Sequence, residues 1–181
     1  MATIIGMSGS LRRGSFNAAL LRAVVELAPT GSKVEVETIK GIPLYDGDLE
    51  AEQGAPALVT ALKNRIAAAE ALLLVTPEYN GSIPGVFKNA IDWLSRPQSD
   101  VARVFGGKPL GLIGATPGGF GTTFSQTGWL PVLRYLGVRP YFGRSLYVSG
   151  ASKIFDTEGM LIDEATRTRV RDYIEGFAKF I

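Results

Sequence analysis

Three short, continuously apolar stretches constrain the fold of this 181-residue chain more than any other feature: Thr3–Gly6, Ala71–Thr76 and Lys108–Gly114. A strand that alternates polar and apolar residues covers one face of a sheet, whereas a continuously apolar strand is buried on both faces. Segments with helical spacing of apolar residues separate these stretches. Such alternation of strands and helices predicts a parallel sheet with helices on both of its faces.

Two weaker strand signals complete the predicted sheet. Val34–Ile39 alternates polar and apolar residues, as a half-exposed edge strand does, and Leu146–Val148 is the candidate fifth strand. A last helix is expected from about Glu164 onward. Five strands alternating with helices predict a single α/β domain over residues 1–181, a three-layer sandwich with a five-stranded parallel sheet of order 2-1-3-4-5. Ligands of such sheets bind beyond the carboxyl ends of the central strands.

Three local features carry expectations of their own. The stretch Gly41–Gly54 is irregular and acidic, and we interpret it as a surface loop with a short turn near Ile42–Tyr45. Pro131 lies in a segment of helical spacing and should start that helix or kink it. Lys88 and Asp92 lie four residues apart on a predicted helix, so we expect a surface ion pair between them.

Cysteine and histidine are both absent from the chain. Disulfides, thiolate nucleophiles and sulfur-ligated metals are thereby excluded, as are hydrolases built on Ser/His or Cys/His pairs. We therefore predict no metal site. What remains is carboxylate or lysine chemistry, or chemistry carried out by a bound cofactor.

The charge distribution gives no indication of nucleic-acid binding, because the net charge is only +2 and no stripe of Lys and Arg residues appears. No apolar run approaches the roughly 20 residues that cross a membrane. The first residues lack the basic and apolar regions of a signal peptide. We therefore expect no membrane contact and a cytoplasmic location.

The loop Met7–Asn17, between the first strand and the first helix, has the chemistry of an anion site. Its hydroxyl and amide side chains and Arg12 can donate hydrogen bonds, and the helix N-terminus adds backbone N–H groups and partial positive charge. The glycines match neither G-x-G-x-x-G nor the P-loop, and the donor set suits a terminal phosphate monoester. The alternative interpretation is a polar turn in which Ser15 merely caps the helix.

The loop after the third strand combines rigidity with an aromatic side chain. Pro77 and Pro84 restrict the backbone around Tyr79 and Asn80, which could then form a wall for a flat heteroaromatic ligand. The alternative is a tight turn in which the prolines only stop a strand and start a helix. We interpret Glu78 as a solvated carboxylate or a cap for backbone N–H groups rather than as a base.

The loop after the fourth strand, Ala115–Gly121, is rich in glycine. Glycine lets a backbone approach the edge of a ligand closely. Taken alone, the loop is equally consistent with a flexible turn.

Together, Gly9–Asn17 and Pro77–Trp93 resemble the NADPH-dependent FMN reductase family, whose members have a flavodoxin-like fold and include quinone, azo-compound and chromate reductases. The resemblance covers nearly the whole chain, including the tail that begins at Phe155–Gly159. It implies FMN as cofactor and NADPH or NADH as co-substrate.

The resemblance also implies roles for individual residues. The FMN phosphate would be held by Ser10, Arg12, Ser15, Phe16 and Asn17. The isoalloxazine would be bordered by Pro77, Glu78, Tyr79, Asn80 and Gly81 on one side and by Thr116, Gly118 and Gly119 on the other. No side chain is expected to act as a catalytic acid or base, because the flavin carries the redox chemistry.

The activity implied is an FMN-dependent NAD(P)H:acceptor oxidoreductase with ping-pong hydride transfer to the flavin and onward to a quinone-like acceptor. The family commonly forms homodimers or homotetramers. The alternatives are a flavodoxin-type electron carrier and a protein that only binds or delivers FMN. The carrier usually presents an acidic surface, which the net charge of +2 disfavours.

Two residues of the loops depart from the family pattern. Gly81 stands where many relatives look bulkier, which predicts a more open flavin pocket. Pro117 lacks an N–H and removes one donor from the third loop.

Overall fold

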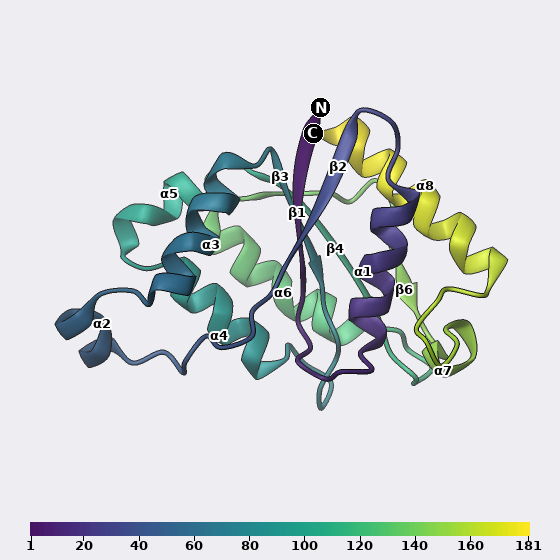
Figure 1. The fold of residues 1–181 in the computed structure, drawn as a ribbon, viewed down its shortest axis with the longest axis horizontal. Coiled ribbons are helices and arrows are strands. Elements are labelled where there is room, and N and C mark those ends of the chain that lie inside the picture. Colours follow the sequence, from purple (N-terminus) through teal and green to yellow (C-terminus); the bar gives the residue numbers. More distant parts are fainter.

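A computed structural model describes residues 1–181 and shows a parallel sheet between two layers of helices (Figure 1). The strands are β1 (Ala2–Ser8), β2 (Ser32–Glu37), β3 (Ala71–Val75), β4 (Pro109–Ala115), β5 (Arg139–Pro140) and β6 (Tyr147–Val148). Their order is β2-β1-β3-β4-β5, and β6 also pairs with β4. The predicted α/β, flavodoxin-like fold and the order 2-1-3-4-5 are thus confirmed, but the sheet has six strands rather than five.

The helices are α1 (Phe16–Leu27), α2 (Gly47–Gln53), α3 (Ala57–Ala68), α4 (Gly85–Leu94), α5 (Val101–Val104), α6 (Thr123–Leu136), α7 (Ala151–Ile154) and α8 (Glu164–Phe180), with a 3-10 turn, η1 (Gln98–Asp100), before α5. Helices α1 and α8 lie on one face of the sheet and α3 to α6 on the other (Figure 1). None of them combines the length and apolar character that a membrane crossing requires.

The central strands supply side chains to both layers, as their apolar sequences predict. All five residues of β3 are buried, and they alternate between the two hydrophobic clusters. Leu73 packs with α1 and α8, whereas Leu72 and Leu74 pack with α3, α4 and α6. Burying one such leucine stabilises the fold by about 2 kcal/mol, so the double-sided strand fixes the sheet at the centre of the molecule.

The predicted fifth strand, Leu146–Val148, is observed as β6, and a short strand that was not predicted, β5, pairs with the opposite end of β4. β5 pairs at Pro109–Leu110 and β6 at Gly114–Ala115. Between them, the backbone N–H of Leu112 donates to the hydroxyl of Tyr173, at 2.9 Å, instead of to a strand. Burial raises the pKa of the Tyr173 hydroxyl far above its usual range, so the hydroxyl stays neutral at this position. A side chain from α8 therefore satisfies the backbone where the strand is interrupted.

The expectation of an irregular loop over Gly41–Gly54 is wrong in part, because its second half forms α2. Asp46 caps this helix by accepting from the N–H of Asp48 at 2.9 Å. The acidic residues Asp48 and Glu50 in the first turn stabilise the helix further, because they interact favourably with the positive end of its dipole. Pro131 does not start α6, which begins at Thr123 and continues through the proline. The Lys88–Asp92 ion pair is present at 2.6 Å.

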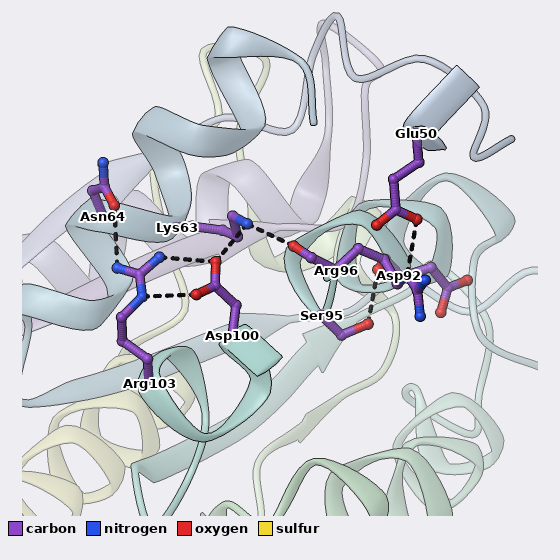
Figure 2. A network of polar contacts seen from close by, with 8 residues as sticks. All are labelled: Glu50, Lys63, Asn64, Asp92, Ser95, Arg96, Asp100 and Arg103. Atoms are coloured by element: carbon purple, nitrogen blue, oxygen red, sulfur yellow. Dashed lines mark hydrogen bonds and ion pairs between the residues drawn. The ribbon is translucent and has the colours of Figure 1, made fainter. Parts of the chain in front are cut away.

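A polar network joins α2, α3, the turn after α4 and α5 (Figure 2). At its centre Lys63 is buried and donates to the carbonyl of Arg96 at 2.6 Å and to Asp100 at 2.7 Å. Asp100 also accepts two hydrogen bonds from Arg103. Further along, Arg96 donates to Glu50 at 2.9 Å and so attaches α2. The network joins α2, α3 and the segment from η1 to α5 with the turn that follows α4.

Candidate functional site

The loops after β1, β3 and β4 meet at one edge of the sheet, where α1 begins (Figure 1), and enclose a cleft of about 320 Å³. The cleft is lined by Ser10, Arg12, Ser15, Phe16, Asn17, Pro77, Glu78, Tyr79, Ala115, Thr116 and Pro117. Most of the residues predicted from the sequence are therefore brought together here. Asn80, Gly81, Gly118 and Gly119 do not line the cleft.

The first loop leads into the N-terminus of α1 with its donors free. Ser15 is the N-cap, and its Oγ accepts from the N–H of Ala18 at 3.2 Å, so the hydroxyl proton remains available to a ligand. The backbone N–H groups of Phe16 and Asn17 make no hydrogen bond within the protein. Arg12 is exposed and lies over the Phe16 ring at 5.3 Å. These are the donors that a phosphate needs at a helix N-terminus.

Asn17 lines the cleft, and both polar atoms of its side chain are hydrogen-bonded within the protein. Its Nδ2 donates to the carbonyl of Ala115 at 2.8 Å, and its Oδ1 accepts from the N–H of the same residue at 2.9 Å. The side chain is buried. The amide therefore links the first loop to the end of β4, a contact that sequence spacing could not reveal.

The second loop is a tight hairpin. Tyr79 and Ser82 exchange backbone hydrogen bonds of 3.2 and 3.0 Å across the two residues Asn80 and Gly81, both of which have positive φ. Such a turn favours the sequence Asn-Gly, so this dipeptide is itself a sequence signal for the hairpin. Both residues form the exposed tip. Gly81 has open space where a Cβ would stand, so the backbone turn explains this glycine and no enlargement of the cleft is involved.

The hairpin is fixed from both sides. The hydroxyl of Tyr79 donates to Ser10 Oγ at 3.4 Å and so bridges the first two loops across the cleft. Beneath it, the buried hydroxyl of Thr76 accepts from Trp129 Nε1 at 3.0 Å and contacts Ser125 Oγ at 2.9 Å. The wall formed by Pro77 and Tyr79 is thereby anchored on α6.

Glu78 caps a helix, as one of the two sequence interpretations predicted. Its Oε2 accepts from the backbone N–H of Ser125 at 3.0 Å, in the first turn of α6, where Thr122 makes no side-chain cap. A carboxylate at this position pairs a backbone N–H that has no partner within the helix, and it interacts favourably with the positive end of the helix dipole.

Replacing Glu78 by alanine is therefore expected to lower the free energy of unfolding by about 1 kcal/mol, the usual cost of a lost cap. Glu78→Gln keeps a neutral acceptor and should cost less. Urea denaturation of the flavin-free protein measures both. An alanine variant as stable as the wild type would show that water replaces the carboxylate at Ser125.

The third loop contributes its first residues to the cleft and then turns away. Ala115, Thr116 and Pro117 line the cleft, whereas the carbonyl of Gly118 accepts from the N–H of Gly150 at 3.1 Å. The next residue, Gly119, is exposed. Ala115 was missed at the sequence level because an alanine carries no chemistry of its own.

A second hollow, of about 370 Å³, lies on the other side of Phe16, which lines both. Arg13 lies there and not in the cleft, together with Arg22 and the segment Asp156–Gly159. The two arginines of the first loop therefore face different surroundings.

The donor set of the cleft fits FMN. Hydroxyls, Arg12 and free N–H groups gather at the end next to α1, and Pro77, Tyr79 and Thr116 line the same cleft. No pair of side chains in the cleft is arranged as a nucleophile with its base, so the chemistry belongs to the bound group.

Comparisons with known proteins identify the family of the chain. Residues 2–153 match the model of the NADPH-dependent FMN reductase family. The chain is 40% identical over 178 residues to an NAD(P)H-dependent FMN reductase of Pseudomonas aeruginosa, covering 98% of this chain and 94% of that protein. It is 38% identical over 173 residues to a 2-hydroxy-1,4-benzoquinone reductase of a Burkholderia species, covering 96% and 92%.

Among solved structures, FerB of Paracoccus denitrificans, a flavoenzyme NAD(P)H:(acceptor) oxidoreductase, superimposes with a TM-score of 0.87 and 33% identity, covering 99% of this chain and 96% of that one. Sequence and architecture thus point to the same group of proteins. The chain belongs to the NADPH-dependent FMN reductase family.

Proposed function

We propose that this protein oxidises NAD(P)H and reduces a quinone-like acceptor in a ping-pong cycle, with FMN held in the cleft between the loops after β1, β3 and β4. The observation that carries the proposal is the convergence of the phosphate donors and the Pro77–Tyr79 wall on one cleft. The benzoquinone reductase among the relatives supports the acceptor class. When bound, FMN supplies the hydride and electron transfer between the two substrates.

The chain itself has three tasks in this proposal. Arg12, Ser10, Ser15 and the free N–H groups of α1 bind the phosphate and so fix one end of the cofactor. The hairpin at Tyr79 and the strand end at Thr116 orient the ring. Rigid walls on both sides exclude water from the reacting face and hold the substrates in position, which is the main requirement of hydride transfer.

We further propose that residues 1–181 form one flavin-binding domain that acts in the cytoplasm, where its NAD(P)H co-substrate is found, and that it associates as a homodimer or homotetramer. A groove of about 350 Å³ between α4 and α6 supports self-association. It is flanked by the exposed Tyr135 and by the oppositely charged Lys88 and Asp92, which a two-fold axis could pair reciprocally. Light scattering measures the state in solution, and a monomer would contradict this part.

Anaerobic titration tests the activity. We expect the purified protein to bind FMN, to lose the absorbance of oxidised flavin when NADPH or NADH is added, and to regain it with a quinone. Initial rates at several fixed quinone concentrations should give parallel double-reciprocal lines, the kinetic signature of a ping-pong cycle. Intersecting lines would contradict that mechanism.

The same titration distinguishes the electron carrier and the FMN-delivery protein. A carrier would be bleached only when a separate reductase is present, and a delivery protein would transfer FMN without being reduced. Direct bleaching by NAD(P)H excludes both.

A further inference from the structure

We infer that Asn17 is a positioning residue that holds the phosphate loop against the opposite wall of the flavin cleft, and that it is not chiefly a ligand of the phosphate. The inference rests on the proposed placement of FMN. It starts from the two hydrogen bonds between the Asn17 amide and the backbone of Ala115, at 2.8 and 2.9 Å.

These bonds take the place of the hydrogen bonds that a further residue of β3 would make with β4. β3 and β4 are paired in parallel up to the bond from Thr76 N–H to the carbonyl of Ile113, at 2.8 Å. In a parallel ladder every second residue of a strand faces the same neighbour, so the next groups of β4 on this side belong to Ala115. At Pro77 the chain leaves the sheet for the hairpin, and no strand remains to pair with them.

The amide side chain of Asn17 matches these two unpaired backbone groups, because its Nδ2 donates and its Oδ1 accepts. Asn17 is 3% exposed and Ala115 is 2% exposed. A buried backbone N–H and C=O without partners would cost free energy at both groups. Because one amide hydrogen and the amide oxygen are committed to Ala115, at most the second hydrogen remains for a phosphate.

The consequence is a mechanical link between the two ends of the cofactor site. Asn17 lies in the first turn of α1, beside the free N–H groups that face the phosphate. Ala115 is the last residue of β4 and passes directly into Thr116 and Pro117, which line the cleft. A shift of the phosphate loop is therefore transmitted to the wall that faces the ring.

The test compares two flavins, of which only FMN carries the phosphate, in Asn17→Ala and in the matched control Arg12→Ala. Dissociation constants are measured by quenching of flavin fluorescence. We expect Asn17→Ala to weaken FMN and riboflavin by similar factors, about 10-fold or more, as for two lost buried hydrogen bonds. Arg12→Ala should weaken FMN by about 10-fold or more and leave riboflavin unchanged, because Arg12 can act only on the phosphate.

A second variant, Asn17→Asp, separates positioning from general disruption of the fold. A protonated carboxyl offers the same donor and acceptor as the amide, whereas an ionised one places a negative oxygen against the Ala115 carbonyl. We expect its riboflavin affinity to recover as the pH is lowered from about 8 to about 5, since burial raises the pKa of a carboxyl. Riboflavin is used because the FMN phosphate itself titrates in this range.

Wild-type protein over the same pH range is the control for the charged groups that line the cleft, Arg12 and Glu78, and circular dichroism checks that each variant is folded. The inference is overturned if Arg12→Ala behaves as expected but Asn17→Ala loses affinity for FMN alone, or loses no affinity for either flavin. If neither variant changes the affinity for either flavin, FMN does not bind in this cleft, and the proposed placement fails together with the inference.

Discussion

Replacing Asp100 by asparagine is expected to lower the free energy of unfolding by about 3–5 kcal/mol, because it leaves the Lys63 ammonium buried without a counter-charge. The Lys63 side chain is only 4% exposed and the Asp100 side chain 26% (Figure 2). Lys63→Met should cost less, about 1–2 kcal/mol. Of the two acceptors that lose the Lys63 donor, Asp100 keeps its hydrogen bonds from Arg103, and only the Arg96 carbonyl is left without a side-chain donor. Urea denaturation of both variants at neutral pH measures the two losses of unfolding free energy.

The same pair predicts a pH dependence. Hydrogen bonds from Arg103 and Lys63 hold the pKa of the Asp100 carboxyl well below its usual range. A carboxyl whose pKa is depressed by folding stabilises the protein above its unfolded pKa, near 4, and loses that contribution as the pH falls further. The difference between the wild type and Asp100→Asn should therefore be constant from about pH 7 to 5 and shrink below about pH 4.

Arg103→Met is the control for the exposed end of this network. The Arg103 side chain is 44% exposed, so we expect its replacement to destabilise the protein much less than Asp100→Asn does. An equal loss of unfolding free energy in Asp100→Asn and Arg103→Met would contradict the prediction. It would show that Lys63 does not depend on Asp100 as its counter-charge.

Replacing Gly114 by alanine is expected to destabilise the fold by about 3 kcal/mol or more and to weaken flavin binding. A Cβ at this position would overlap the carbonyl oxygen of Thr76 and the hydroxyl of Thr122. A backbone oxygen cannot move away as the end of a flexible side chain can, so β4 and the chain at Thr76, which leads into the Tyr79–Ser82 hairpin, must separate. Thermal unfolding and the FMN dissociation constant measure the two effects.

Gly85→Ala is the matched control, because a Cβ there meets no atom and the residue is the first of α4. It should be neutral or slightly stabilising, since alanine is a better helix former than glycine. A Gly114→Ala protein with wild-type stability would mean that β4 and Thr76 are less closely packed than described.

The sheet could be predicted because its signals are local. Continuous apolar runs identified β1, β3 and β4, and Ser15 marked the start of α1. The helix α2 escaped prediction because it buries no residue and is specified mainly by the cap at Asp46 and the glycine at its end, a weak signal in an acidic segment. The break between β5 and β6 escaped because it depends on Tyr173, which lies far away in the sequence.

In the candidate site, too, some features follow from the sequence and others depend on contacts between distant residues. Residue types alone excluded histidine and cysteine chemistry and left carboxylate, lysine or cofactor chemistry. The spacing of strands and helices placed three loops at one edge of the sheet. Only the tertiary structure decided what each side chain does there: Glu78 caps α6, Asn80 and Gly81 form the tip of a hairpin, and Asn17 bonds to a backbone that lies 98 residues away. The physical reason is that a side chain's chemistry is fixed by its type, whereas its hydrogen-bond partners are chosen by which unpaired backbone groups the finished fold brings within reach.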